Sequence, residues 1–265
     1  MKRFSTLSAL LTLALLLCGC TDISDRVITG TGQTDDDYIP GVGGDLLIVE
    51  TEDIGGSSDV QQPQPPMEDY SSYSFSPVQE DFIASCLFMG DSICSGIGSY
   101  GFSGACYAKA GVAARNILEF TFDFNDAQVG PLTALVNSGS KNLVFLMGTN
   151  DVNMVSVKEY TDYYDDFLTK VEASCPGVTI YVLSVPPVTE DSNFCYNYQL
   201  DDLNTALKYM IEDSNRPRHY IDCASLLKND GGGLKEIYSA GDGVHLSRAA
   251  YYAMLYALCT GAGVQ

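Results

Sequence analysis

The sequence has no tryptophan, only two histidines and few basic residues, with 14 lysines and arginines against 34 aspartates and glutamates. The formal charge of −20 argues against nucleic-acid binding, because phosphate contacts depend on lysine and arginine. It also argues against electrostatic binding to anionic lipid. There is no CxxC pair, which disfavours a zinc cluster, and we expect neither a metal nor a cofactor.

Long apolar runs are also lacking, except for one near the N-terminus. A basic start at residues 1–3 is followed by an apolar run at 7–17, which is too short to span a membrane comfortably. This segment resembles a bacterial lipoprotein signal, and by that resemblance Cys20 becomes the lipidated first residue of the mature protein. We therefore expect residues 1–20 to be a signal peptide. We also expect the protein to be exported and held at the membrane only by its lipid. An ordinary secretory signal is the alternative.

Residues 21–81 lack the apolar content of a folded domain. They are rich in glycine, proline and glutamine, and contain 14 acidic residues against one basic residue, Arg26. High like charge with few apolar groups disfavours a core, so this segment is predicted to be a flexible tether. Residues 82–265 are then the catalytic or binding domain. Seven cysteines follow the signal, and because this number is odd at least one thiol is free; the sequence indicates no pairing.

From residue 82 onward, apolar runs alternate with helical patterns. The runs at 83–89, 105–110, 142–147, 178–185 and 219–223 are expected to be strands. Helices are expected at 113–120, 131–137, 157–173, 198–212 and 247–258. Continuous apolar strands separated by helices predict an α/β fold of three layers, α/β/α, with a central parallel sheet.

Polar turns follow several of these strands. Ser92 comes after the first strand in Gly90-Asp91-Ser92, Gly111 follows the second, and Asn150 lies in Gly148-Thr149-Asn150-Asp151 after the third. A fourth turn, Asp242-Gly243-Val244-His245, precedes the last helix. Each alone has a plainer interpretation as a helix cap or a turn. However, the carboxyl ends of parallel strands share one edge, so we expect these turns to meet there.

Together these residues match the requirements of ester hydrolysis. Ser92 is the candidate nucleophile and His245 the candidate base, because a histidine pKa lies near neutral pH. Asp242, three residues earlier, can hold the imidazole in the correct tautomer. The backbone N–H groups of Ser92 and Gly111 and the side-chain amide of Asn150 are the candidate donors to an oxyanion.

This set of blocks resembles the SGNH hydrolases, also called the GDSL family of esterases and lipases. The resemblance spans residues 82–258, with the blocks in family order and Ile93 in place of the namesake leucine. It implies the flavodoxin-like SGNH hydrolase fold, the catalytic triad Ser92, Asp242 and His245, and an oxyanion hole of Ser92, Gly111 and Asn150.

The expected function is therefore an exported serine esterase that cleaves oxygen esters through an acyl-enzyme. We expect O-acetyl or other short acyl groups on carbohydrate as the substrate. A lipase or lysophospholipase, an acyltransferase, and a non-catalytic surface protein that binds carbohydrate remain alternatives. Five aromatic residues are candidates for stacking on sugars or for plain packing: Tyr100, Phe102, Tyr163, Phe194 and Tyr196.

Overall fold

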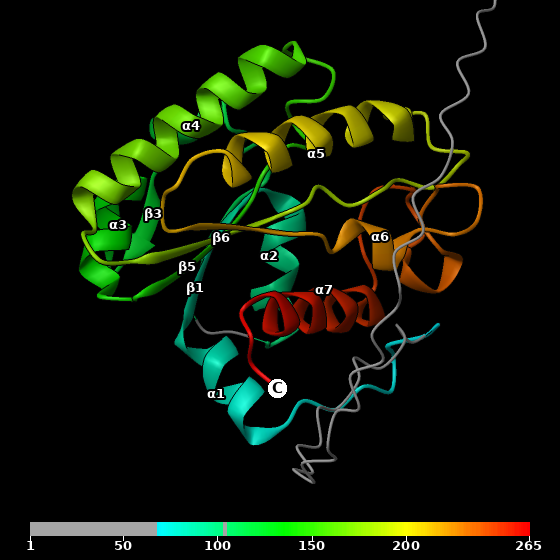
Figure 1. Ribbon diagram of the computed structural model, residues 1–265, viewed down its shortest axis with the longest axis horizontal. Coiled ribbons are helices and arrows are strands. Elements are labelled where there is room, and N and C mark those ends of the chain that lie inside the picture. The colour runs from blue at the N-terminus through cyan, green and yellow to red at the C-terminus, as the bar shows by residue number, and fades with distance from the viewer. Residues whose placement is uncertain (1–67, 103–104) are drawn as a thin grey trace, which may run out of the picture. The chain divides into compact units, whose positions relative to one another are not determined.

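The computed structural model describes residues 68–102 and 105–265, which are built on a five-stranded parallel sheet (Figure 1). Its strands, in spatial order, are β2 (Cys106–Ala108), β1 (Cys86–Gly90), β5 (Asn142–Leu146), β6 (Thr179–Leu183) and β7 (Arg218–Ile221). All four neighbouring pairs are parallel, so the carboxyl ends of all five strands lie along one edge. The predicted parallel sheet is confirmed.

Helices cover both faces of this sheet and complete the three predicted layers (Figure 1). One face is covered by α3 (Pro131–Ser138), α4 (Val157–Ser174) and α5 (Asn197–Glu212). The other is covered by α1 (Pro77–Ser85), α2 (Ser92–Ser99), α6 (Ala224–Leu227) and α7 (Arg248–Gly261).

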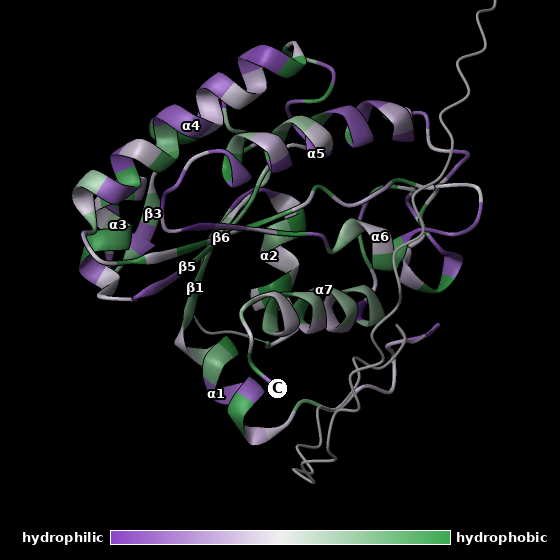
Figure 2. Ribbon diagram, viewed as in Figure 1, coloured by the Kyte–Doolittle hydropathy of each residue, from purple (hydrophilic) through white to green (hydrophobic). Residues whose placement is uncertain are grey.

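The three central strands β1, β5 and β6 are buried on both sides because both faces of the sheet are covered. In β1, Leu87 and Met89 pack into one core, while Cys86 and Phe88 pack into the other. Figure 2 shows β1 and β5 largely in the hydrophobic colour and much of α4 in the hydrophilic colour. Such continuous burial is typical of parallel sheets and explains why the strands have no alternating polar pattern.

The helix α4 shows how the sequence sets an element's start and its buried face. Ser156 caps the helix by accepting a hydrogen bond from the Glu159 N–H, and the Glu159 side chain accepts one from the Ser156 N–H. This reciprocal capping box fixes the first turn. One stripe of the helix is then buried against the sheet, formed by Tyr160, Tyr164, Phe167, Leu168 and Val171.

Two local predictions are wrong. Residues 83–85, expected to be strand, form the last turn of α1, which starts at a capping box between Ser76 and Gln79. Residues 113–120, expected to be helix, contain only the short 3₁₀ helix η1 (Ile117–Glu119). A hairpin of β3 (Phe122–Phe124) and β4 (Ala127–Val129) follows, and its turn at Asn125 and Asp126 has positive φ at both residues. Asn and Asp tolerate that conformation better than other non-glycine residues.

The folded domain starts earlier than the predicted residue 82. Tyr70 is fully buried, its N–H donates to the Tyr238 hydroxyl at 3.2 Å, and its ring lies 4.9 Å from that of Tyr256. Tyr238 ends the 3₁₀ helix η2 (Glu236–Tyr238). The aromatic residues near position 70 therefore pack into the domain, although the acidic composition around them predicted a tether. The predicted signal 1–20, Cys20 and the tether up to residue 67 lie outside the described residues.

The described residues contain no helix that is both long and apolar enough to cross a membrane. All seven cysteines in this part of the chain are free thiols.

Candidate active site

Ser92 is presented at the carboxyl edge of the sheet by the turn from β1 into α2. A β-carbon on Gly90 would lie 1.9 Å from the carbonyl oxygen of Leu146, so only glycine fits where β1 ends against β5. Asp91 then caps α2, because its Oδ1 accepts the N–H groups of Ile93 at 2.9 Å and Cys94 at 3.3 Å. Ser92 is consequently the first residue of the helix, with its hydroxyl partly exposed.

The structure brings the three predicted triad residues together. His245 Nε2 lies 3.0 Å from Ser92 Oγ, although the two residues are 153 positions apart. His245 Nδ1 lies 2.6 Å from Asp242 Oδ2. With Nδ1–H donated to the carboxylate, Nε2 is left with a lone pair directed at the serine hydroxyl, which is the arrangement a general base needs.

The turn at 242–245 holds this acid and base in register. Asp242 Oδ1 accepts the N–H groups of Val244 at 2.9 Å and His245 at 2.7 Å, leaving Oδ2 for the imidazole. These two backbone N–H groups, followed by the imidazole, lower the pKa of Asp242 to about 2. Asp242 is therefore ionised throughout the pH range in which a histidine base works.

The triad lies open to solvent. The side chains of His245 and Asp242 are 47% and 54% exposed, respectively. An ester on a bulky molecule can therefore approach the serine without first entering a tunnel.

The predicted oxyanion donors lie at the same edge. Asn150 Nδ2 donates to the carbonyl of Val112 at 2.9 Å, which joins the loop after β5 to the loop after β2 beside Gly111. The Lys109 N–H donates to the carbonyl of Gly90 at 3.2 Å and ties that second loop to the end of β1. Among the described residues, the N–H groups of Ser92 and Gly111 have no acceptor, so both are free to bind an oxyanion.

Asp151 is a supporting residue to which the sequence reasoning assigned no role. It is fully buried and accepts the N–H groups of Ala114 at 2.8 Å and Arg115 at 3.3 Å. It also pairs with the Arg115 guanidinium at 3.2 Å, and that guanidinium binds the carbonyl of Asn150. Asp151 thus clamps the two oxyanion loops together. The signal for this role in the sequence is an acidic residue directly after Asn150, in the turn that follows a buried strand.

Asp91, directly before Ser92, is a buried carboxyl. Its side chain is fully buried, and Oδ2 has no hydrogen-bond partner among the described residues. Burial raises the pKa of this carboxyl to about 7, because the charged form loses its hydration. The cap of α2 is therefore neutral in acid and charged only near neutrality and above.

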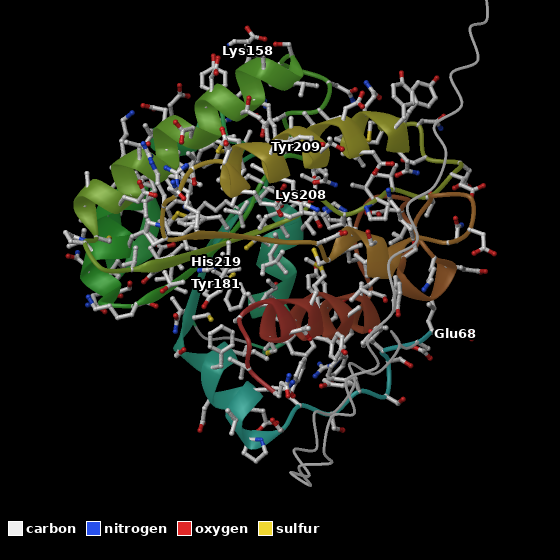
Figure 3. All side chains as sticks on the ribbon, viewed as in Figure 1. Glu68, Lys158, Tyr181, Lys208, Tyr209 and His219 are labelled. Carbon is white, nitrogen blue, oxygen red and sulfur yellow. The ribbon has the colours of Figure 1, made fainter. Side chains whose placement is uncertain are left out.

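The second histidine belongs to another region. His219 is exposed on the edge strand β7 and stacks on Tyr181, with ring centroids 5.4 Å apart (Figure 3). Among the residues that the structure describes, no three His, Cys, Asp or Glu side chains gather in a way that could hold a metal ion.

Sequence comparison supports this chemistry. The model of the GDSL-like Lipase/Acylhydrolase family matches residues 88–253, which include all four polar turns. The chain belongs to this family. It is accordingly a carboxylic ester hydrolase, as the sequence motifs predicted. No curated protein sequence matches the chain.

Solved structures share the fold at low sequence identity. A Streptococcus pneumonia protein provisionally named a platelet activating factor is 22% identical, with a TM-score of 0.54 over 69% of this chain and 90% of its own. A GDSL-like lipase from Bacteroides thetaiotaomicron VPI-5482 is 15% identical, with a TM-score of 0.52 over 66% and 85%. The lipase Lip_vut3 from a goat rumen metagenome is 15% identical, with a TM-score of 0.51 over 68% and 98%. At these identities the likeness concerns the fold alone, which it confirms.

Proposed function

We propose that this hydrolase cleaves short acyl esters of carbohydrate, chiefly acetyl esters, with Ser92, His245 and Asp242 as its triad. The observation that carries the proposal is the continuous chain of contacts from Asp242 through His245 to the Ser92 hydroxyl, at 2.6 and 3.0 Å. Without such contacts a serine hydroxyl is a weak nucleophile at neutral pH.

The geometry supports a two-step reaction. Ser92 Oγ attacks the ester carbonyl carbon while His245 Nε2 takes the hydroxyl proton, and the resulting oxyanion accepts hydrogen bonds from the N–H groups of Ser92 and Gly111 and from Asn150. The carbon–oxygen bond to the alcohol then breaks, and the imidazolium returns its proton to the departing alcohol oxygen. Water, deprotonated by the same imidazole, then attacks the carbonyl carbon of the acyl-enzyme. The bond from this carbon to Ser92 Oγ breaks, and the imidazolium returns the proton to Oγ, which releases the carboxylic acid and restores the Ser92 hydroxyl.

The direct test uses Ser92→Ala with Ser99→Ala as the matched control, because Ser99 is exposed at the other end of α2. We expect Ser92→Ala to abolish hydrolysis of p-nitrophenyl acetate and labelling by a fluorophosphonate probe, while Ser99→Ala retains both. Full activity in folded Ser92→Ala would refute the assignment. Product analysis with an added sugar acceptor would distinguish hydrolysis from acyl transfer.

The proposed substrate class is supported by the openness of the site and by the charge of the chain. An exposed triad suits an ester on a large polymer, and the formal charge of −20 disfavours an anionic lipid surface. Acetylated xylan should therefore be cleaved faster than long-chain lipid esters. Preference for the lipid esters would favour a lipase or lysophospholipase.

We further propose that the protein is exported and anchored outside the cytoplasm through a lipid on Cys20. The support is the sequence of residues 1–20 alone. Cys20→Ser should abolish incorporation of a labelled fatty acid and release the protein from the membrane fraction, whereas Cys18→Ser should not. Equal lipid labelling in both variants and in the wild type would contradict the assignment.

A further inference from the structure

A cavity of about 670 Å³ lies beside the loop that carries Asp242 and His245. Three loops line it, within residues 189–194, 229–236 and 239–244. Its volume falls in the range of small-molecule binding sites. Its lining includes Asp242, Gly243 and Val244 but neither His245 nor any of the predicted oxyanion donors, so it lies beside the loop that holds the acid and the base.

Backbone contacts fix the position of this cavity relative to the triad. The Thr189 N–H donates to the Gly243 carbonyl at 3.0 Å, and a β-carbon on Gly243 would lie 3.0 Å from Thr189 Oγ1. Gly243 also has a φ of +81°, which favours glycine. On the far side, Asn153 Nδ2 donates to the Phe194 carbonyl at 2.6 Å. The loop at 189–194 is thereby tied both to the triad loop and to the segment that follows Asn150.

The chemistry of acyl transfer determines which part of an ester lies on this side. The imidazolium of His245 must protonate the oxygen of the departing alcohol, so the alcohol has to lie next to the imidazole. Residues 242–244, which directly precede His245 in the same turn, line the cavity. It is therefore placed to receive the alcohol part of the ester, while the acyl part faces the oxyanion donors.

The groups that face the cavity suit a molecule rich in hydroxyl groups. The side chains of Asn193 and Glu236 are exposed and make no hydrogen bond to other described residues. Asn229 Oδ1 accepts the N–H groups of Gly231 at 2.9 Å and Gly233 at 3.0 Å, which leaves its amide protons for a ligand. Donors and acceptors side by side match hydroxyls, since each hydroxyl both donates and accepts. Phe194 adds an aromatic surface at the rim.

The acidic lining of the cavity also disfavours negatively charged ligands. Asp191, Glu236 and Asp242 line it, and no lysine or arginine is among the described lining residues. A phosphorylated or carboxylated alcohol would meet like charge there, which costs affinity. We propose that this cavity is the alcohol-binding subsite and that it selects uncharged, hydroxyl-rich sugars over anionic alcohols. The inference rests on the proposed function and specifies which residues recognise the substrate.

The test compares three acetyl esters: p-nitrophenyl acetate, an O-acetylated methyl xyloside and an O-acetylated glucuronic acid. We expect Asn193→Ala and Glu236→Ala each to lower the ratio of kcat/KM for the acetylated xyloside to that for p-nitrophenyl acetate by roughly two- to tenfold, the effect of losing one hydrogen bond. The lower ratio should come from a higher KM for the acetylated xyloside, with kcat unchanged. Glu80→Ala on α1, which also removes an exposed carboxylate, should leave the ratio unchanged.

The charged ester tests the selection directly. The wild type should prefer the xyloside to the glucuronic acid ester, and Glu236→Gln should narrow that preference while keeping the side chain's size. Unchanged ratios in both alanine variants, or a wild type that prefers the anionic ester, would overturn the inference while p-nitrophenyl acetate is still cleaved through Ser92. If the proposed function itself were wrong, the result would be different, because Ser92→Ala would then retain wild-type hydrolysis of p-nitrophenyl acetate.

Discussion

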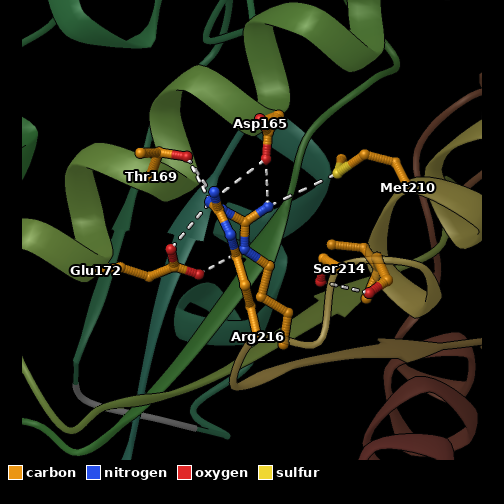
Figure 4. A network of polar contacts seen from close by, with 8 residues as sticks. Asp165, Thr169, Glu172, Met210, Ser214 and Arg216 are labelled. Atoms are coloured by element: carbon orange, nitrogen blue, oxygen red, sulfur yellow. Dashed lines mark hydrogen bonds and ion pairs between the residues drawn. The ribbon is translucent and has the colours of Figure 1, made fainter.

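Charged side chains are buried and paired at the amino end of the central sheet, whereas at its carboxyl end they are exposed or incompletely paired. At the amino end, the guanidinium of Arg218 is fully buried and donates to Glu172 Oε1 and Asp165 Oδ1, each at 2.6 Å. Thr169 and Arg216 join the same cluster, where Arg216 lies between the two acids (Figure 4). All three guanidinium nitrogens of Arg218 have a partner, and the network ties the edge strand β7 to α4.

At the carboxyl end, charge is left exposed or incompletely paired. The side chains of His245 and Asp242 are about half exposed, and Asp91, next to Ser92, has a buried oxygen without a partner among the described residues. A buried ion with paired hydrogen bonds holds a structure together, whereas an unpaired one lowers stability and is retained where function needs it. The amino end should therefore control stability, and the carboxyl end should control activity.

The largest expected effect separates these roles at the triad. Asp242→Asn keeps an oxygen for the N–H groups of Val244 and His245 but places an amide against His245 Nδ1. The imidazole then adopts the tautomer with its proton on Nε2 and cannot accept one from Ser92. We expect kcat to fall by roughly 10³- to 10⁴-fold.

Thermal unfolding provides the check for Asp242→Asn. Its Tm should stay close to that of wild type, because Asp242 lies at the surface and substitutions of exposed residues usually change stability little. A variant with wild-type kcat would show that Asp242 does not set the tautomer.

The second prediction concerns the buried carboxyl of Asp91 and the pH dependence of the stability that it causes. In the unfolded chain this carboxyl ionises near its ordinary pKa of 3.8, but burial raises the pKa in the folded protein to about 7. The folded state therefore holds one more proton between these values, and stability falls as pH rises from about 4 to 7. Asp91→Asn removes this dependence, and its stability relative to wild type should increase by roughly 2–4 kcal/mol across that window.

Urea unfolding of both proteins at pH 4 and pH 7 measures the effect. Asp81→Asn, which removes one exposed carboxylate on α1, is the matched control and should show no such trend. A pH-independent difference between Asp91→Asn and wild type would contradict a buried, titrating cap.

The sequence predicted much of the catalytic end because its residues follow local rules. Strand ends marked by glycine and polar residues placed Ser92 and Asn150 at one edge, and the polar turn before the last helix supplied His245, which the fold brings to the same edge. The roles of Asp151 and Thr189 could not be predicted in this way. Both act through contacts with loops far away in the sequence, and such contacts leave no periodic pattern.

The errors in the fold have a similar origin. Tyr70 is buried by Tyr238 and Tyr256, and no local pattern connects these positions. Residues 113–120 have helical composition but form turns and the short η1, and this segment is held by hydrogen bonds from the N–H groups of Ala114 and Arg115 to the distant Asp151 carboxylate. In both places tertiary contacts outweigh the local preference.

The third prediction tests the paired end. Arg218→Met keeps the side-chain volume but leaves Glu172 and Asp165 without their buried partner. Because these acids are 20% and 47% exposed, water compensates for part of the loss, so we expect about 2 kcal/mol rather than the larger cost of fully buried pairs. The Tm should fall by roughly 4–8 °C. The kcat of the folded variant should equal that of wild type, and a selective loss of activity would link the two ends.

The smallest effect on stability is expected for Arg216, and it allows an exposed arginine to be compared with a buried one in the same cluster. Arg216 donates to Thr169 at 2.7 Å and pairs with Glu172 at 3.2 Å, but its side chain is 40% exposed. Exposed pairs contribute at most about 1 kcal/mol and are screened by salt, so Arg216→Met should be destabilising by less than Arg218→Met. In 1 M NaCl the effect of Arg216→Met should vanish, while that of Arg218→Met persists. Equal losses at both positions would mean that burial does not decide which arginine holds β7 to α4.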